Sequence, residues 1–310
     1  MDADRSRPVA GVGLAVAAIT VANLLGGISY LWQKLALEGL PPATVIWLRN
    51  AVALALMAGW IAWRGGPFWP YDRRATLRLF LVGNLAYGLP LILGIVGVDW
   101  STSGNGAILI LLEPGAILLF SWWLLSESIR RLQVLGIAAG LIGALLVVTE
   151  EAPLGALFAG SHLHGNIALA VHGVLWGLYS PLIKPLADKH RDAVGLTFAP
   201  MLLANVLLVP AALSEASEWQ AGPALASSLV WALWLGLLAS FAGTILWTYS
   251  LATLRASTVA PFVFLQPLAG VVAGWLVLDE RVSADALAGG LLIGAGVALV
   301  LWRPRRRAAA

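Results

Sequence analysis

Residues 111–130 read LLEPGAILLFSWWLLSESIR, and residues 264–283 read FLQPLAGVVAGWLVLDERVS. Each stretch places a proline inside an apolar run and ends that run with a glutamate. A gapless shift of 153 positions brings Pro114 onto Pro267 and also pairs Ala116 with Ala269, Trp122 with Trp275, Leu125 with Leu278, Glu127 with Glu280, Gly136 with Gly289 and Gly143 with Gly296. Apolar helices resemble one another by composition, but proline, tryptophan, glutamate and glycine in one register indicate a duplicated unit. Further upstream, a shift of 150 pairs Gly27 with Gly177 and Lys34 with Lys184.

The composition around these stretches is that of an integral membrane protein. Hydrophobic residues make up 60% of the chain and charged residues 11%, with a mean hydropathy of +0.86. A soluble domain carries about 25% charged residues. The absence of cysteine excludes disulfides, cysteine-based zinc sites and a cysteine nucleophile. The net charge of +3 comes from cations spread over short loops and a small basic tail, so no nucleic-acid partner is expected.

A membrane-spanning helix needs about 20 mostly apolar residues. That rule predicts ten spans: Val9–Leu31, Ala43–Trp63, Ala75–Val98, Ser103–Leu125, Leu132–Thr149, Gly165–Leu186, Ala193–Leu213, Ser227–Ala252, Ser257–Leu278 and Ala284–Trp302. The connections between them are too short for a soluble domain. Membrane lipid is therefore an obligatory partner.

The distribution of Lys and Arg predicts that both termini are cytoplasmic, because cytoplasmic loops retain positive charge. With that orientation only Lys34, Arg49 and Arg281 of the 19 basic residues fall outside. We expect Arg49, near the outer end of its span, to reach toward the lipid headgroups.

Ten spans divide into two five-span repeats, residues 1–150 and 151–310. Because five is odd, the second repeat enters the membrane from the opposite side. The predicted fold is therefore an all-α membrane protein of two inverted five-helix repeats around a central cavity. Such repeats suit alternating access, with substrate bound near the midplane.

Residues 243–300, GTILWTYSLATLRASTVAPFVFLQPLAGVVAGWLVLDERVSADALAGGLLIGAGVALV, resemble the second half of an EamA-type member of the drug/metabolite transporter superfamily. Residues 101–129, STSGNGAILILLEPGAILLFSWWLLSESI, resemble the corresponding part of the first half. Within the superfamily, the chain is similar to YddG-type bacterial amino-acid exporters. The resemblance implies a bacterial inner-membrane location and a cavity lined by the first, third, fourth, sixth, eighth and ninth spans. The second repeat departs in having Gln266 where the first has Glu113.

Glu113 lies inside an apolar span beside Pro114. A charge in the membrane interior costs at least about 2.5 kcal/mol, so such groups normally face a cavity or a partner. One interpretation is a cavity carboxylate that binds a substrate amine or a proton. The alternative is a protonated side chain, or one bonded to backbone carbonyls that Pro114 frees.

Polar and aromatic residues inside the expected lining spans are the other site candidates. His172, Trp176 and Tyr179 fall on roughly one helical face. The remaining candidates are Tyr87, Asn84, Asn105, Thr244, Trp247 and Ser240. Each could instead face lipid or bond between helices, but together they favour a cavity for a zwitterion with an apolar or aromatic side chain. Pro90, Pro114, Pro181 and Pro267 are candidate hinges, with static kinks as the alternative.

These features favour a secondary transporter that exports amino acids, including aromatic ones. Efflux of cationic or aromatic drugs is the alternative within the carrier class. An intramembrane enzyme is disfavoured because the sequence contains neither a phosphate-binding Gly-rich loop nor an HExxH motif. We expect no metal, no cofactor and no catalytic residue, and a monomer with a small-molecule substrate.

Overall fold

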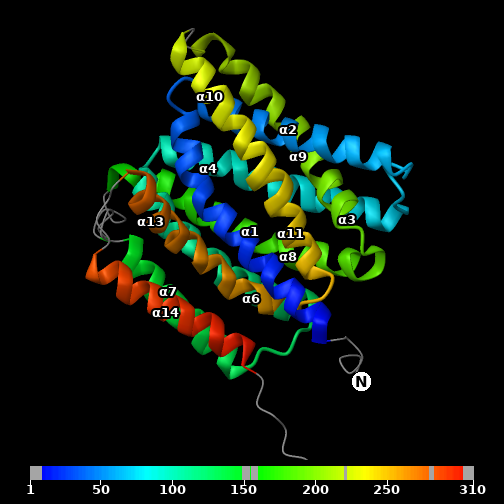
Figure 1. Cartoon of the computed structure of the whole chain (residues 1–310), viewed down its shortest axis with the longest axis vertical. Coiled ribbons are helices and arrows are strands. Elements are labelled where there is room, and N and C mark those ends of the chain that lie inside the picture. The colour runs from blue at the N-terminus through cyan, green and yellow to red at the C-terminus, as the bar shows by residue number, and fades with distance from the viewer. Residues whose placement is uncertain (1–8, 149–153, 155–159, 220–221, 279–282, 303–310) are drawn as a thin grey trace, which may run out of the picture.

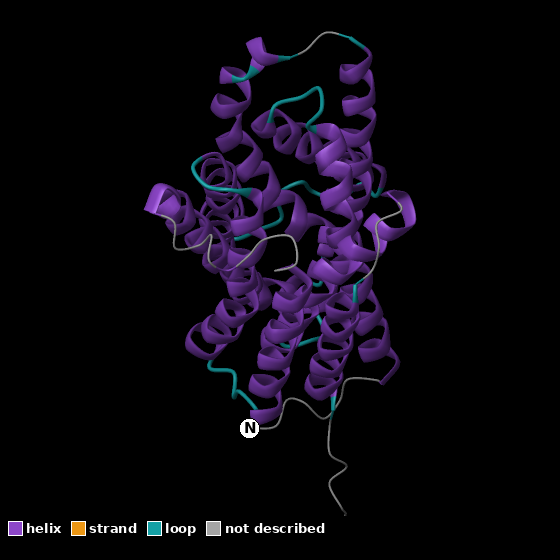
Figure 2. Cartoon of the chain, turned by 90° about the vertical axis from the view of Figure 1, so that its left-hand side faces the viewer, coloured by secondary structure: helices purple, strands orange, loops and turns teal. Residues whose placement is uncertain are grey.

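The computed structural model describes residues 9–148, 154, 160–219, 222–278 and 283–302. These residues form helices joined by short loops, and no strand occurs among them (Figures 1 and 2). The elements are α1 (Val9–Ala36), α2 (Pro42–Trp63), α3 (Arg73–Gly83), η1 (Asn84–Gly88), α4 (Leu89–Asp99), α5 (Ser103–Leu109), η2 (Ile110–Leu112), α6 (Glu113–Leu125), α7 (Arg131–Val148), η4 (Gly160–His162), α8 (Leu163–His190), α9 (Ala193–Ser214), η5 (Ala216–Glu218), α10 (Pro223–Trp234), η6 (Leu235–Gly243), α11 (Thr244–Leu251), α12 (Ala256–Val259), η7 (Ala260–Phe264), α13 (Leu265–Leu278) and α14 (Ala284–Leu301).

The prediction of ten spans is confirmed. Ten continuous helical stretches of the described chain are long and apolar enough to cross a membrane. Many of their large apolar side chains lie on the outside, including Trp63 and Leu291 at 78% exposure. An apolar exterior of this kind needs lipid rather than water around it. The start of α1 and the end of α14 lie at the same end of the bundle (Figure 1).

Two helices run further than the apolar count predicted. Helix α1 continues past Leu31 to Ala36, and its polar residue Gln33 accepts a hydrogen bond from Arg49. Helix α8 continues past Leu186 to His190, where buried Lys184 pairs with Asp188 one turn later (2.6 Å). Polar residues therefore end the apolar run but not the helix, because Gln33 and Lys184 each find a bonding partner.

Helices α7 and α14 cross at two glycine pairs. A Cβ added to Gly136 would lie 2.6 Å from the carbonyl oxygen of Gly296, and one added to Gly143 would lie 2.5 Å from that of Gly289. The beginning of α7 thus meets the end of α14, so the two helices run antiparallel where they touch. Small residues let membrane helices approach this closely.

The contacts of α1 with α13 resemble those of α8 with α6. A Cβ on Gly27 would lie 2.6 Å from that of Ala269, and one on Gly177 would lie 2.4 Å from that of Ala116. Sequence shifts of 150 and 153 relate the members of one pair to those of the other. Equivalent helices of the two halves therefore make equivalent contacts.

Four helix irregularities also occur at related positions. The π-helical segments η1 and η6 interrupt the third and eighth spans, and the 3₁₀ segments η2 and η7 precede α6 and α13 in the fourth and ninth. Mid-helix 3₁₀ turns often mark hinges, and π segments often occur at functional sites. These four segments are therefore candidate positions for a functional site in the bundle.

Glu127 follows α6 and caps the start of α12. Its carboxylate accepts hydrogen bonds from the backbone N–H groups of Ala256 (3.1 Å) and Ser257 (3.0 Å), and from the Ser257 hydroxyl. A carboxylate at a helix N-terminus satisfies otherwise unpaired donors. Glu127 therefore caps α12, whereas its counterpart Glu280 lies outside the described residues.

Candidate functional site

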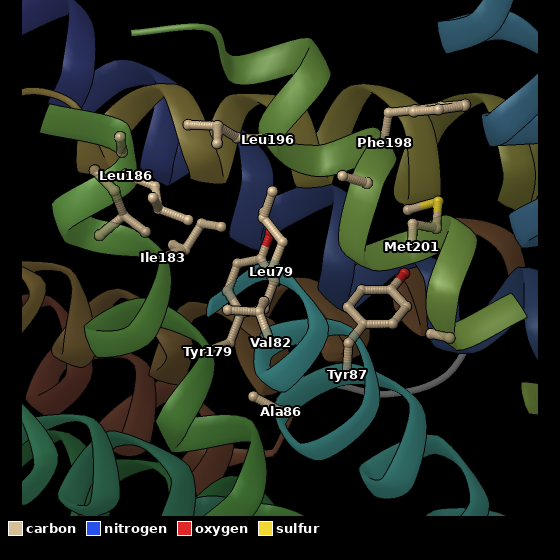
Figure 3. Packing of buried hydrophobic residues seen from close by; sticks show 14 of the residues in the cluster. Leu79, Val82, Ala86, Tyr87, Tyr179, Ile183, Leu186, Leu196, Phe198 and Met201 are labelled. Atoms are coloured by element: carbon tan, nitrogen blue, oxygen red, sulfur yellow. The ribbon is translucent and has the colours of Figure 1, made fainter. Parts of the chain in front are cut away.

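Aromatic side chains from both halves meet in the interior of the bundle. The Tyr87 ring, from η1, lies edge-on to that of Trp176 in α8, with ring centres 5.2 Å apart. Tyr179 lies 6.2 Å from Tyr87, and His172 lies 6.3 Å from Trp176. Figure 3 shows Tyr87 and Tyr179 projecting from η1 and α8 into a buried layer that also contains Leu196 and Met201 of α9. The structure therefore brings these four predicted residues together; we call them the aromatic cluster.

Hydroxyl groups border the aromatic cluster on the side of α9 and α11. The Thr248 hydroxyl lies 3.2 Å from that of Tyr179 and accepts a hydrogen bond from Thr197 (3.0 Å). Trp247 donates its indole N–H to Ser180 (3.0 Å). These bonds join α8, α9 and α11, and they satisfy polar groups that a lipid interior would leave unpaired.

Adjacent residues of α2 reach the two π-helical segments. Arg49 donates from Nε to the Ser240 hydroxyl in η6 (2.8 Å) and from Nη1 to Gln33 in α1 (3.2 Å). Asn50 accepts a hydrogen bond from the Tyr87 hydroxyl in η1 (3.3 Å). The expectation that Arg49 reaches the headgroups is wrong, because Ser240 is only 1% exposed and draws the guanidinium inward.

Glu113 is the first residue of α6 and is 9% exposed. Its carboxylate makes no hydrogen bond or ion pair with any described residue. In the second half, Gln266 at the equivalent position donates to Asn23 of α1 (3.0 Å). The shift of 150 places Gly173 of α8 where α1 has Asn23, so the first half has no side chain there to pair with Glu113.

The other predicted residues are spread over the bundle. Asn84 donates to the carbonyl of Phe80 (2.9 Å), one turn earlier in its own helix, and Thr244 makes a long local bond to Ala239 (3.5 Å). Asn105 lies near the start of α5, where it donates to Ser101 (2.9 Å) and to Asn166 of α8 (3.0 Å). The bonds described for these three side chains do not join them to the aromatic cluster.

The predicted hinge prolines lie at or near irregular helix segments or inside helices. Pro90 follows η1, and its carbonyl accepts a hydrogen bond from His172 Nδ1 (2.6 Å). Pro114 and Pro267 follow the two 3₁₀ segments, and Pro181 lies inside α8. Their movement stays a prediction.

A pocket of about 130 Å³ includes Thr248, one of the hydroxyl residues that border the aromatic cluster, in its lining. It is lined by Arg191 and Asp192 at the α8–α9 connection and by Thr248, Ala252 and Thr253 on the other side, with four further residues of the same helices. A separate groove of about 270 Å³ is lined by apolar residues of α6 and by Ile129. Thr248 lines the first pocket, and its hydroxyl lies 3.2 Å from that of Tyr179 in the aromatic cluster. No group of three or more His, Asp or Glu side chains among the described residues is placed to hold a metal ion.

A family model described as the EamA-like transporter family matches residues 13–149 and again residues 163–302. The chain belongs to the EamA-like transporter family. Its EamA-like relatives include an "Uncharacterized transporter" of Archaeoglobus fulgidus, 25% identical over 285 residues, which cover 91% of this chain and 95% of the relative. A "Probable terminal-alkyne amino-acid exporter" of Streptantibioticus cattleyicolor is 28% identical over 233 residues, which cover 73% of each chain. One crystal structure matches with a TM-score of 0.77 and 18% identity over 92% of this chain and 95% of that chain, which shows that the two chains share a fold.

Sequence reasoning did not name Asn50 or Thr248, and it misplaced Arg49. The available signal was position: Arg49 lies seven residues inside a helix that begins at Pro42, about 10 Å from its end at ~1.5 Å per residue. An arginine at that depth is costly unless it faces the protein interior.

Proposed function

We propose that this EamA-like protein is a secondary transporter that exports amino acids across a bacterial inner membrane. Transport proceeds by alternating access between two inverted halves, with both termini in the cytoplasm. The substrate binds at the aromatic cluster.

The repeated contacts support inverted halves. If two repeats pointed the same way, equivalent glycines of α7 and α14 would lie level with each other. Instead Gly136 meets Gly296, the equivalent of Gly143, and Gly143 meets Gly289, the equivalent of Gly136. That exchange is what a twofold axis in the membrane plane produces, and such an axis makes inward-open and outward-open arrangements nearly equivalent.

The observation that carries the substrate proposal is the meeting of Tyr87 with Trp176 and Tyr179 inside the bundle. The rings offer an apolar wall, and Thr248 and Asn50 border it with polar atoms. Arg49 brings a guanidinium and Glu113 a titratable carboxyl group into the interior. Such a pair of groups fits a zwitterion, which agrees with the amino-acid exporter named among the relatives.

Purified protein in liposomes tests this function. We expect flux of labelled amino acids, greatest for phenylalanine, leucine and similar side chains, and little flux of a lipophilic cation such as tetraphenylphosphonium. Absence of flux for every amino acid in a panel of twenty would contradict the proposal.

One observation favours a second candidate, efflux of cationic aromatic compounds. Glu113 is buried with no bonding partner among the described residues, and a cation beside Trp176 or Tyr87 would gain from the ring faces. Flux of tetraphenylphosphonium that requires Glu113, without amino-acid flux, would favour this alternative.

A further inference from the structure

Glu113 carries a carboxyl group whose charge is not fixed by the rest of the described chain. The side chain is 9% exposed at the start of α6, and it makes no hydrogen bond or ion pair with any described residue. An ionised carboxylate that is buried without a partner destabilises a fold. The group is therefore suited to two situations, a neutral form that holds a proton and an ionised form that pairs with a cation from outside the chain.

The contacts between α6 and α8 place this carboxyl group along the bundle. A Cβ on Gly173 would lie 2.8 Å from the carbonyl oxygen of Leu109. A Cβ on Gly177 would lie 2.4 Å from that of Ala116. Glu113 falls between these two contacts, so it is level with the turn of α8 that carries the tryptophan of the aromatic cluster. The carboxyl group and the proposed substrate site therefore lie at the same depth in the bundle.

The second half has a neutral group at the equivalent position. Gln266 donates to Asn23 (3.0 Å), and Asn23 donates to the carbonyl of Ile19 (2.8 Å). An amide side chain does not take up a proton as a carboxylate does. Only the first half therefore supplies a proton-binding group at this position, which makes one such site in each polypeptide.

The elements that make the main contacts with α6 bring few other ionisable groups near Glu113. These elements are α8, η7, α12 and η2, and the last three contain no ionisable side chain. On α8, His172 donates to or accepts from a carbonyl of α4 (2.6 Å), and the Tyr179 hydroxyl lies 3.2 Å from a hydroxyl of α11. The other ionisable residues of α8 lie toward its two ends, where Lys184 pairs with Asp188 (2.6 Å). Glu113 is therefore the acidic group at this level of α6 and its neighbours.

We propose that the transporter exchanges its substrate for a proton and that Glu113 binds the two in turn. This proposal rests on the proposed function and adds its driving force. On the cytoplasmic side, the carboxyl O–H bond breaks, its proton passes to water, and the carboxylate pairs with the ammonium group of the substrate. On the outer side the substrate leaves, and the carboxylate takes a proton from water there. One proton enters for each substrate molecule exported.

Liposomes with an acidic interior test this coupling. Valinomycin with equal potassium on both sides holds the membrane potential at zero. An interior about one pH unit more acidic than the outside should drive labelled phenylalanine to about a 10-fold higher concentration inside, because a one-to-one exchange converts a tenfold proton ratio into a tenfold substrate ratio. Phenylalanine that only equilibrates, without accumulating, would overturn the coupling.

Proton release from the purified protein tests the site itself. In weakly buffered detergent solution containing a pH-indicator dye, phenylalanine should release up to about one proton per polypeptide, since one carboxyl group holds one proton. A second compound, 3-phenylpropionate, lacks the amine and should release none. Equal release by both compounds would show that the ammonium group does not displace the proton, which would overturn the proposal.

Substitution of Glu113 should abolish both signals. For Glu113→Gln we expect neither proton release nor accumulation driven by the pH gradient, whereas Glu113→Asp keeps a carboxyl group and should retain both. The matched control is Glu38→Gln, because Glu38 is exposed in the turn that follows α1, and it should behave as the wild type. Proton release that persists in Glu113→Gln would assign the proton to another group and overturn the proposal.

The outcomes separate the coupling from the function. If the wild type carries no amino acid, both fall. If it equilibrates phenylalanine but neither accumulates it nor releases protons, the coupling alone is overturned. Should Glu113→Gln fail to elute as a folded protein, Glu113→Asp replaces it: the shorter side chain should shift the pH at which proton release is half-maximal, and an unchanged pH profile overturns the proposal.

Discussion

At the scale of single residues, the two buried carboxyl groups Glu127 and Glu113 differ in whether they have hydrogen-bond partners. Glu127 and Glu113 are equally buried at 9% exposure. Glu127 accepts three hydrogen bonds at the start of α12, whereas Glu113 has no partner among the described residues. Hydrogen bonds to a charged acceptor stabilise a fold, and an unpaired buried charge destabilises it.

Glu113→Gln should therefore lose activity without losing stability. The amide has nearly the same volume and removes an unpaired buried carboxylate, so we expect an equal or higher melting temperature in detergent. Flux of phenylalanine should fall at least about 10-fold. Glutamine can neither form a charge-assisted hydrogen bond to the substrate ammonium group nor bind a proton. Glu127→Gln is the matched control, and its melting temperature should fall, since an amide N–H₂ replaces one acceptor oxygen. Unchanged flux in Glu113→Gln would make Glu113 a structural residue.

At the scale of helices, close packing depends on glycines at particular positions of α14. A Cβ on Gly289 would lie 2.5 Å from the carbonyl oxygen of Gly143, whereas one on Gly294 meets nothing within 4 Å. Alanine is also the better helix former by roughly 0.5–1 kcal/mol. The two positions therefore respond to the same substitution in opposite directions.

Gly289→Ala should lower the melting temperature by several degrees, because the backbones of α7 and α14 must separate. Gly294→Ala in the same helix should leave it unchanged or raise it slightly. Thermal unfolding of both variants, followed by intrinsic tryptophan fluorescence, measures the difference. Equal melting temperatures would mean that the crossing relaxes without cost.

A second helix-scale feature joins the start of α3 to the end of α8. Asp72 accepts a hydrogen bond from the Ala75 backbone N–H (2.8 Å) and from Lys189 (2.9 Å). Chiefly the backbone bond, and then Lys189, lower the pKa of this exposed carboxyl to about 2. A lowered folded-state pKa contributes stability that is complete above the unfolded value, 3.8, and is lost as the pH falls toward 2.

The effect of Asp72→Asn on the melting temperature should change with pH over the same range. We expect the difference in melting temperature between wild type and variant to stay constant from pH 7 to about pH 5 and to narrow below about pH 4. Differential scanning fluorimetry across this range gives the profile. A difference that disappears already at pH 6 would show that another group controls it.

At the scale of the whole molecule, the two halves should face opposite compartments. The chain contains no cysteine, so single-cysteine variants can be labelled without removing native thiols. Pro67 and Glu218 are exposed in the connections that follow α2 and α9, the equivalent loops of the two halves. In intact cells, a membrane-impermeant maleimide should label Glu218→Cys and should label Pro67→Cys only after lysis. Labelling of both before lysis would exclude inverted halves.

The sequence was sufficient for the ten spans because hydropathy reports which residues lie at membrane depth. It also favoured an interior position for Tyr87, Trp176 and Tyr179, because the family resemblance assigned their spans to the lining of the cavity. Arg49 was misplaced at the headgroups, because counting charges by loop ignores how deep in the helix an arginine lies. Asn105 was chosen as a site candidate because it is a polar residue inside a span. Its position along the helix and the direction of its side chain instead place it beside Ser101 and Asn166, and residue type does not reveal either.

The glycine crossing of α7 and α14 also bears on how such a chain can be assembled. Gly136 and Gly143 are matched by Gly289 and Gly296, so each half supplies both kinds of surface that the crossing requires. The two halves should then be able to assemble without the peptide connection that follows α7. We expect a gene cut between residues 149 and 162 to yield two polypeptides that find each other in the bilayer, and a protein that tolerates such division could be rebuilt from exchanged halves of its relatives.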